Sequence, residues 1–296
     1  MKVLYGIKEN RVDVTDICLT KLTYNNTIIT IPNGDDNRAL FFNDHLYGIL
    51  KKIFIILNDN EFEYDHTHIV KINIIDSTIN TESRNSIIDD KLNTIHSKLK
   101  IKYGNLNAEL PEQKMVVRYL TGNEKVLELG SNIGRNSLVI ASIVKNDNFV
   151  TMECSINIAK QLEENRDINN YTFHIEKSAL SKRKLIQRGW NTKPSNVLES
   201  GHEWVNTLSF DELQLKYNIE FDTLVLDCEG AFYFMLMDMP EILNNIKLVI
   251  MENDYFDIAH MEYVHSILKK YNFHNDYREA GGWGCCYNNF FEVWIR

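Results

Sequence analysis

Residues 126–138, VLELGSNIGRNSL, decide the fold of this 296-residue chain. A short apolar run ends at Gly130, a second glycine follows at Gly134, and an apolar stretch with helical spacing comes next. Glycines in a strand-to-helix turn let the backbone approach a ligand closely, and the N-terminus of the helix that follows favours negative charge. The stretch therefore predicts a ligand-binding turn, although two glycines alone are equally compatible with a packing role.

Outward from this turn, strand and helix patterns alternate from Pro111 to the C-terminus. The run TLVLD (223–227) is continuously apolar, as a buried central strand requires. The last two predicted strands, 272–277 and 290–296, have no helix between them and must pair as a hairpin. We predict an α/β fold with a mostly parallel sheet, helices on both faces and an antiparallel edge.

The N-terminal part has a different pattern. Residues 1–75 contain short apolar runs separated by turn clusters, which predicts a small β-rich module whose strands include the runs 14–22 and 39–57. Residues 76–110 are polar, with apolar residues at helical spacing between Ile87 and Leu99, so we expect a helical linker there. The third segment, 111–296, is the α/β domain. His66 and His68 would share one face of a strand, and we interpret them as surface residues rather than a metal site.

Composition excludes several classes of protein. Lys and Arg number 32 against 41 Asp and Glu, a net charge of −9 that argues against binding to nucleic-acid phosphates. The sequence contains no run of about 18 apolar residues, so we expect no membrane span. Charged residues appear too early at the N-terminus for a signal peptide. The five cysteines form no C-x-x-C pair, which indicates free thiols in a reducing, cytoplasmic compartment and no zinc site. The abundance of Asn and Ile is typical of an AT-rich genome, such as that of a low-GC bacterium or a large DNA virus.

The spacing of the glycines limits which class of ligand the turn can bind. G-x-x-x-G lacks the middle glycine that seats a dinucleotide pyrophosphate, and no G-K-S/T follows it. An acidic residue ahead of the glycines, Glu128, suits a ligand with a cationic amino-acid end and no phosphate, which describes S-adenosylmethionine. Glu153 ends the next strand about twenty residues on, where a carboxylate can accept hydrogen bonds from both ribose hydroxyls. The alternative for Glu153 is a helix-start carboxylate. In the third strand, the backbone amide of Ala179 is placed to meet the adenine.

The segment FDTLVLDCEGAF (221–232) supplies the catalytic candidates. Asp227 and Glu229 stand at the carboxyl end of a buried strand, where open α/β sheets bind ligands. Strand alternation predicts that these two side chains point to the same side and that Cys228 points the other way. One carboxylate can then position or deprotonate a substrate hydroxyl. The alternative is that this D-x-E pattern merely caps a helix.

Glu252, Asn253 and Asp254 follow the next strand and suggest a metal. With Asp227, they would offer oxygen ligands to Mg²⁺, which would lower the pKa of the hydroxyl and replace a general base. A polar strand end that caps the following helix explains the same residues without a metal.

At this point the motifs resemble a known family. The runs LELGSNIGRNSL, MECS, VNTLSFDELQLKY and DTLVLDCEGAFYFML are similar to those of FkbM-type S-adenosylmethionine-dependent methyltransferases, over residues 111–296. The resemblance implies a seven-stranded class I Rossmann-like fold and methyl transfer to an oxygen, often on a sugar. It implies catalytic roles for Asp227 and Glu229, and cofactor contacts at Glu128, Gly130, Asn132, Gly134, Glu153 and Asp227.

Three positions depart from the family pattern. Cys154 replaces the proline of the usual E-P pair, and Glu128 replaces the commoner aspartate. Phe232 stands where the family has the last glutamate of D-V-E-G-A-E, so the substrate pocket is expected to differ. The run FFNDHLYGILKKIFI (41–55) is similar to accessory modules of sugar-modifying proteins of large DNA viruses.

Three functional hypotheses remain open. The first is a sugar or glycan O-methyltransferase, in which Trp190, Trp204 or Trp283 would cover a sugar face. For Trp283, packing within the C-terminal hairpin is the alternative. The second is an RNA or cap methyltransferase, which needs a basic groove; the run KSALSKRKLIQR (177–188) is the candidate for one. The third is a non-catalytic binding protein in which the glycine turn persists only as structure. Calorimetry with S-adenosylmethionine separates the enzyme hypotheses from the third.

Overall fold

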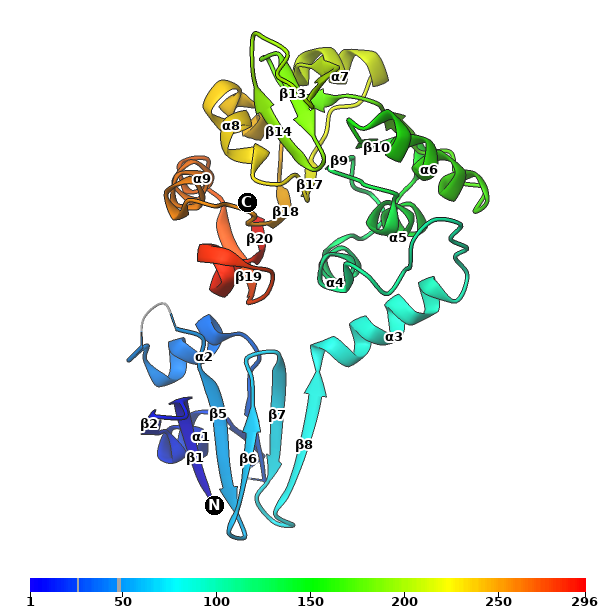
Figure 1. Cartoon of the computed structure of the whole chain (residues 1–296). Helices are drawn as coiled ribbons and strands as arrows, with labels where there is room; N and C mark the ends of the chain where they lie inside the picture. Colours follow the sequence, from blue (N-terminus) through cyan, green and yellow to red (C-terminus); the bar gives the residue numbers. More distant parts are fainter. Residues whose placement is uncertain (26, 47–48) are drawn as a thin grey trace. The chain divides into compact units, whose positions relative to one another are not determined.

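The computed structural model describes residues 1–25, 27–46 and 49–296 (Figure 1). Tyr47 and Gly48, within the run 41–55 quoted above, lie outside the described residues, as does Asn26. The chain divides into two compact units, Met1–Asp90 and Lys91–Arg296. In the part of the chain that the structure describes, no helix is long and apolar enough to cross a membrane.

The first unit is rich in antiparallel β-structure, as predicted. One sheet has the order β2 (Asn10–Asp13), β1 (Lys2–Ile7), β5 (Lys52–Leu57) and β6 (Asn60–Tyr64). The other has the order β3 (Thr23–Tyr24), β4 (Ile28–Ile31), β7 (His68–Asn73) and β8 (Thr78–Ser83). Because β8 pairs with β7, this unit extends beyond the boundary at residue 75 that the sequence suggested.

Two runs predicted as strands are helices. α1 (Thr15–Lys21) and α2 (Asp35–Phe42) occupy parts of the runs 14–22 and 39–57. The buried pair Val14 and Cys18 is spaced by four residues, the helical repeat, and the Asp13 carboxylate accepts a hydrogen bond from the Thr15 amide at 3.0 Å. α3 (Arg84–His96) forms the expected amphipathic helix of the linker.

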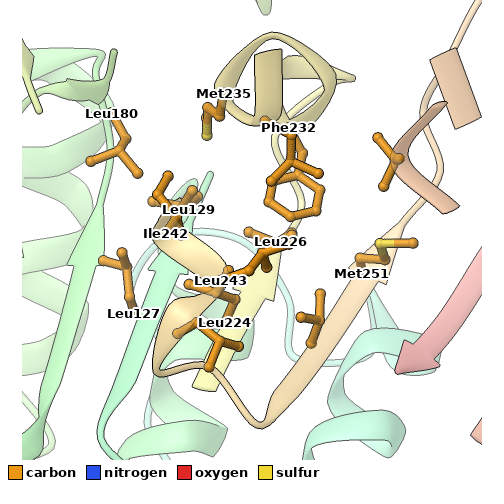
Figure 2. Packing of buried hydrophobic residues seen from close by; sticks show 14 of the residues in the cluster. Leu127, Leu129, Leu180, Leu224, Leu226, Phe232, Met235, Ile242, Leu243 and Met251 are labelled. Carbon is orange, nitrogen blue, oxygen red and sulfur yellow. The ribbon is translucent and has the colours of Figure 1, made fainter. Parts of the chain in front are cut away.

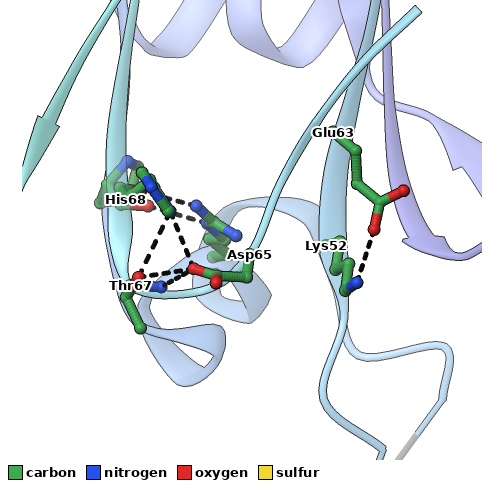
Figure 3. Close-up of polar contacts among 7 residues, drawn as sticks. Lys52, Glu63, Asp65, Thr67 and His68 are labelled. Carbon is green, nitrogen blue, oxygen red and sulfur yellow. Dashed lines mark hydrogen bonds and ion pairs between the residues drawn. The ribbon is translucent and has the colours of Figure 1, made fainter.

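The two histidines do not form a metal pair. β7 begins at His68, so His66 lies outside the strand and shares no face with it. Nδ1 of His68 lies 2.8 Å from the Asp65 carboxylate and 3.3 Å from the Thr67 hydroxyl (Figure 3). Among the described residues, the carboxylate group close enough to share a metal includes neither histidine.

The second unit is built on a seven-stranded sheet. Its order is β11 (His174–Glu176), β10 (Phe149–Met152), β9 (Val126–Leu129), β17 (Thr223–Leu226), β18 (Leu248–Glu252), β20 (Phe291–Ile295) and β19 (His274–Glu279). All neighbours are parallel except β20, which runs antiparallel to both β18 and β19. The expected hairpin is therefore present, but its antiparallel strand lies inside the sheet and β19 forms the edge.

Helices cover both faces of this sheet, as predicted. They are α4 (Leu110–Tyr119), α5 (Arg135–Ile143), α6 (Ile156–Asp167), α7 (Phe210–Tyr217), α8 (Ala231–Asp238) and α9 (Ile258–Lys270). Figure 1 shows α4 and α5 on one side of the central strands, and α8 and α9 on the other. On the second side, alternate residues of β9 and β17 pack under α8 and the following turn; Figure 2 shows Leu127, Leu129, Leu224, Leu226, Phe232 and Met235 there.

Residues 185–205, for which no strand was predicted, form a small sheet. β13 (Leu185–Arg188), β14 (Asn191–Pro194) and β15 (Glu203–Val205) pair antiparallel, and we call residues 185–205 the arm. β13 and β14 are joined by the two residues Gly189 and Trp190. Gly189 has φ +60°, the left-handed conformation that such tight hairpins require. The arm follows β12 (Ala179–Leu180), which pairs with β16 (Thr207–Leu208).

The strand order creates a switch point between β9 and β17. From β9 the chain adds β10 and β11 on one side of the sheet, then crosses to add β17 and β18 on the other. Parallel sheets bind ligands in the crevice outside the carboxyl ends of the strands at such a point. Gly130 follows β9 and Asp227 follows β17, so both sequence candidates lie at this crevice.

Candidate functional site

A cavity of about 150 Å³ opens at the carboxyl ends of β9, β10 and β17. We call it the large cavity. The sheet edge, the segment around β12, the arm and α8 each supply part of its wall. The arm contributes Leu185, Gln187, Trp190, Thr192 and Pro194, so the inserted sheet covers one side of the crevice.

Gly130 is required by the contact between the two central strands. Its φ is +84°, and a Cβ there would lie 1.6 Å from the carbonyl oxygen of Asp227. The amide of Asp227 donates to the Leu129 oxygen at 3.0 Å, which brings the two backbones together. The turn therefore stands directly beside the end of β17.

The other residues of the glycine turn have two different roles: one lines the cavity and one stabilises the turn itself. Asn132, with φ +50°, lines the large cavity, and its predicted contact with a cofactor stays a prediction. Gly134 does not line it: its amide donates to the Ser131 oxygen at 2.8 Å, and a Cβ would meet the Leu162 side chain at 2.2 Å. The predicted cofactor contact at Gly134 is therefore replaced by a role in closing the turn at the start of α5.

Glu153 follows β10 and lies between the glycine turn and the start of α6. It lines the large cavity, and its carboxylate accepts hydrogen bonds from the amides of Asn132 at 3.0 Å and Ser155 at 2.8 Å. The bond to Ser155 holds the start of α6, and the bond to Asn132 ties the glycine turn to β10. The Cys154 amide also donates to this carboxylate, so about one of its four acceptor positions stays open. Burial raises the pKa of Glu153.

Ala179 lines the large cavity but cannot offer its amide to a ligand. That amide donates to the Asn206 oxygen at 2.8 Å as part of the pairing between β12 and β16. The predicted amide contact to adenine is therefore wrong. No local sequence pattern indicates this pairing, because the partner strand lies beyond the arm.

Glu128 is buried beneath the turn instead of facing the large cavity. It accepts hydrogen bonds from the hydroxyls of Ser137 and of Thr151, the latter at 2.7 Å. Burial raises its pKa to about 7, although both hydroxyl donors favour the ionised form. Glu128 instead lines a second, smaller cavity.

This small cavity is acidic. Its wall comprises Glu109, Glu112, Glu128, Gly130, Ser131, Asn136, Val225 and Asp227. Gly130 and Asp227 line both cavities, so the two spaces meet at the junction of β9 and β17. Among the residues that the structure describes, none gives a hydrogen bond to Oε2 of Glu112 or Oδ1 of Asn136, and both acceptors are buried. Arg135 pairs with Glu109 at the rim of this group. A cationic hydrogen-bond donor would satisfy both orphaned acceptors.

Asp227 and Glu229 both line the large cavity, but not by strand alternation. β17 ends at Leu226, and Glu229 has φ +51°, so these residues form a turn. Cys228, expected to point away, lines the cavity too. Burial raises the pKa of Glu229, and it also raises the pKa of the Cys228 thiol to about 12, which keeps that thiol protonated and unreactive.

Asp227, Glu252 and Asp254 form a close carboxylate trio. Their oxygen atoms lie within 4.8 Å of one another. Burial and repulsion from Asp254 hold the pKa of Asp227 well above its ordinary value. The pKa of Asp254 is raised to about 7 by burial and by Glu229, and that of Glu252 is raised further by burial and a shared proton with Glu112. The trio suits either a divalent cation or a cationic ligand group.

Asn253, named with these residues as a metal ligand, points to the other side of β18. Its amide nitrogen donates to the Glu292 carboxylate at 3.1 Å. Glu292 is fully buried and also accepts hydrogen bonds from the His265 ring and the Trp294 indole, at 2.6 and 3.0 Å. This network fixes the end of β18. Of the four residues predicted as metal ligands, Asp227, Glu252 and Asp254 therefore lie together, and Asn253 does not join them.

Sequence reasoning missed Glu109 and Glu112. They flank Pro111 at the start of α4, and nothing in their spacing relates them to the glycine turn. They join the site only because α4 packs beside α5 and against β18.

Comparisons with known proteins return structures of similar architecture. No protein-family model matches the chain, and no curated protein matches it. Among solved structures, an O-methyltransferase from Bacillus cereus has 15% identity and a TM-score of 0.39, with 71% of this chain and 91% of that chain covered. Magnesium protoporphyrin IX methyltransferase from Synechocystis has 12% identity and a TM-score of 0.40, covering 72% and 92%. A putative RNA methyltransferase from Pyrococcus horikoshii has 10% identity and a TM-score of 0.41, covering 73% and 98%. We draw no functional conclusion from likeness at this level.

The clash at Gly130 predicts that Gly130→Ala destabilises the second unit by several kcal/mol, because β9 and β17 must separate. Gly189→Ala is the matched control: its φ is also positive, but nothing lies within 4 Å of a Cβ there. It should cost about 1 kcal/mol from left-handed strain alone. Urea unfolding of both variants measures the difference. Equal losses would contradict the close approach at Gly130.

The buried carboxylate predicts a pH-dependent effect of Glu128→Gln. The pKa of about 7 in the folded protein exceeds the ordinary 4.5, so folding favours the protonated form, and this stability is lost as pH rises through 7. Glu128→Gln should therefore stabilise the protein by about 3 kcal/mol at pH 8 and by less than about 1 kcal/mol at pH 5. Urea unfolding at both pH values tests this, with the exposed Glu203→Gln as control. A gain that is equal at both pH values would refute the assignment.

Proposed function

We propose that the second unit is an S-adenosylmethionine-dependent O-methyltransferase that acts on a sugar hydroxyl. The observation that carries this proposal is the junction at Gly130 and Asp227, where an acidic small cavity with orphaned acceptors meets a larger, partly apolar cavity. The proposal accords with the resemblance of residues 111–296 to FkbM-type methyltransferases.

The residues present fit this cofactor. Its methionine end carries an ammonium, which would supply donors to the unpartnered oxygens of Glu112 and Asn136. Its sulfonium would be favoured by the carboxylate of Asp254, whose pKa is raised to about 7 by burial and by repulsion from Glu229. Glu153 on the wall of the large cavity retains an acceptor position for a ribose hydroxyl, and Leu180 and Met152 give the same wall an apolar surface for adenine.

The bound cofactor would supply an electrophilic methyl group. With such a cofactor bound, Asp227 would hold the acceptor hydroxyl and take its proton as the hydroxyl oxygen accepts the methyl group. A carboxylate whose pKa is raised by burial is a stronger base once ionised, which suits this role at neutral pH. Glu229, on the same wall, is placed to orient a neighbouring hydroxyl.

Charge favours a sugar over RNA as the acceptor. The carboxylates around Asp227 would repel a phosphate backbone. The basic run 177–188 does not offset this, because Lys177, Lys182 and Arg183 pair with Glu163, Glu241 and Asp238. A neutral, hydroxyl-rich acceptor avoids the repulsion. Salt-dependent RNA binding by the full chain would favour the RNA alternative.

The first prediction concerns the cofactor. Calorimetry should show that S-adenosylmethionine binds the wild-type chain, and that Glu153→Gln weakens this binding at least tenfold, because an ionised acceptor for the ribose is lost. Glu212→Gln, on exposed α7, is the control and should bind as the wild type does. The absence of binding at millimolar cofactor would reject the enzyme proposal.

The second prediction concerns catalysis. Asp227→Asn should change cofactor affinity by less than about threefold, because the amide resembles the protonated acid that burial favours, whereas methyl transfer should fall at least about a hundredfold. The assay follows labelled methyl transfer to sugar nucleotides and short glycans, with exposed Asp211→Asn on α7 as control. Unchanged turnover would remove Asp227 from the proposed role.

The same assay decides the role of the carboxylate trio. If EDTA abolishes transfer and Mg²⁺ restores it, Asp227, Glu252 and Asp254 hold a divalent cation that lowers the pKa of the hydroxyl. If EDTA has no effect, the carboxylate of Asp227 acts as the base on its own.

A further inference from the structure

Two aromatic side chains stand exposed together near the carboxylate trio. Phe256 is 86% exposed and Trp283 is 41% exposed, and their ring centroids lie 4.6 Å apart at an interplanar angle of 53°. Scattered exposed aromatics need no explanation, but two that pack on each other in solvent form an apolar patch of the kind that marks a binding site. Because the rings are tilted, they do not cover each other and leave aromatic surface free.

The chain places this pair beside the proposed reaction centre. Phe256 lies two residues beyond Asp254, so their Cα atoms are at most about 7 Å apart. Trp283 belongs to the loop between β19 and β20, and that loop is tied to the same segment by the Cys285 thiol, which donates to the Tyr255 oxygen at 3.2 Å.

The turn that carries Glu229 adjoins this segment. A Cβ on Gly230 would lie 3.1 Å from the Asp254 oxygen and 3.4 Å from the Tyr255 ring. Repulsion from Glu229 also raises the pKa of Asp254, after the larger effect of burial. Two aromatic rings and two carboxylates are thus gathered on three neighbouring loops at one edge of the sheet.

We propose that Phe256 and Trp283 form the acceptor subsite and receive the C–H face of a pyranose ring, while Glu229 and Asp254 accept hydrogen bonds from its hydroxyls. The inference rests on the proposed function and adds the residues that would select the acceptor. A pyranose presents an apolar face and a hydroxylated rim, which matches aromatic rings bordered by carboxylates.

Charge argues against a second copy of the chain as the occupant. A symmetric dimer through this patch would bring the carboxylates of Glu229 and Asp254 from both copies together, and like charges across an interface are unfavourable. A neutral sugar encounters no such repulsion.

The test measures sugar binding directly, without turnover. Saturation-transfer NMR on the full chain, with S-adenosylhomocysteine present, uses the methyl pyranosides of glucose, galactose, mannose and rhamnose as probes. We expect binding of at least one probe, with saturation strongest on its ring C–H protons. Phe256→Ala and Trp283→Ala should each weaken it roughly fivefold, whereas Phe256→Tyr should retain it.

Leu215→Ala, at an equally exposed position on α7, is the matched control and should bind the sugar as the wild type does. Calorimetry with S-adenosylmethionine should be unchanged in all variants, which separates loss of the acceptor subsite from loss of the cofactor site. If no probe binds, or the alanine variants bind as the wild type does, the proposal is overturned. Light scattering that shows a dimer abolished by Phe256→Ala would assign the patch to a second copy and also overturn it. Absent cofactor binding would instead reject the proposed function.

Discussion

Mutual repulsion among carboxylates at the carboxyl edge of the sheet is the constraint on which the site depends. Asp227, Glu252 and Asp254 crowd together, and their pKa values are raised because burial and like charge both oppose ionisation. Burial likewise raises the pKa of Glu128, which lies beneath the glycine turn. Such a cluster must hold protons or attract positive charge. A ligand with an ammonium and a sulfonium relieves it where a phosphate-bearing ligand would not.

The fold holds this cluster in place from several directions. The close approach of Gly130 to the Asp227 backbone fixes the junction of β9 and β17, and the buried Glu292 network fixes β18 from behind. The hydrogen bond from Asn132 to Glu153 then connects the turn with β10. Carboxylates that would move apart in a flexible loop are therefore kept together, which preorganises the site for a cation.

Sequence reasoning recovered what local pattern encodes. The stretch 126–138, the apolar strands and the C-terminal hairpin follow from periodicity, and the resulting sheet places Gly130 and Asp227 at one crevice. The predictions were wrong for features that depend on contacts between residues far apart in the sequence. The Ala179 amide is taken by Asn206, and the arm consists of strands too short and polar for periodicity to reveal. α1 and α2 were mistaken for strands because their few buried residues also fit a short apolar run.

The central claim is that negative charge at this site selects a cationic cofactor, and the pH dependence of binding tests it most directly. Calorimetry would compare S-adenosylmethionine with neutral adenosine at pH 5.5 and pH 7.5. Because the pKa values of Glu128 and Asp254 are both about 7, this rise in pH adds negative charge to the site. The account predicts that S-adenosylmethionine binds several-fold more tightly at pH 7.5 while adenosine affinity stays constant. An affinity for S-adenosylmethionine that is unchanged between the two pH values, or weaker at pH 7.5, would contradict it.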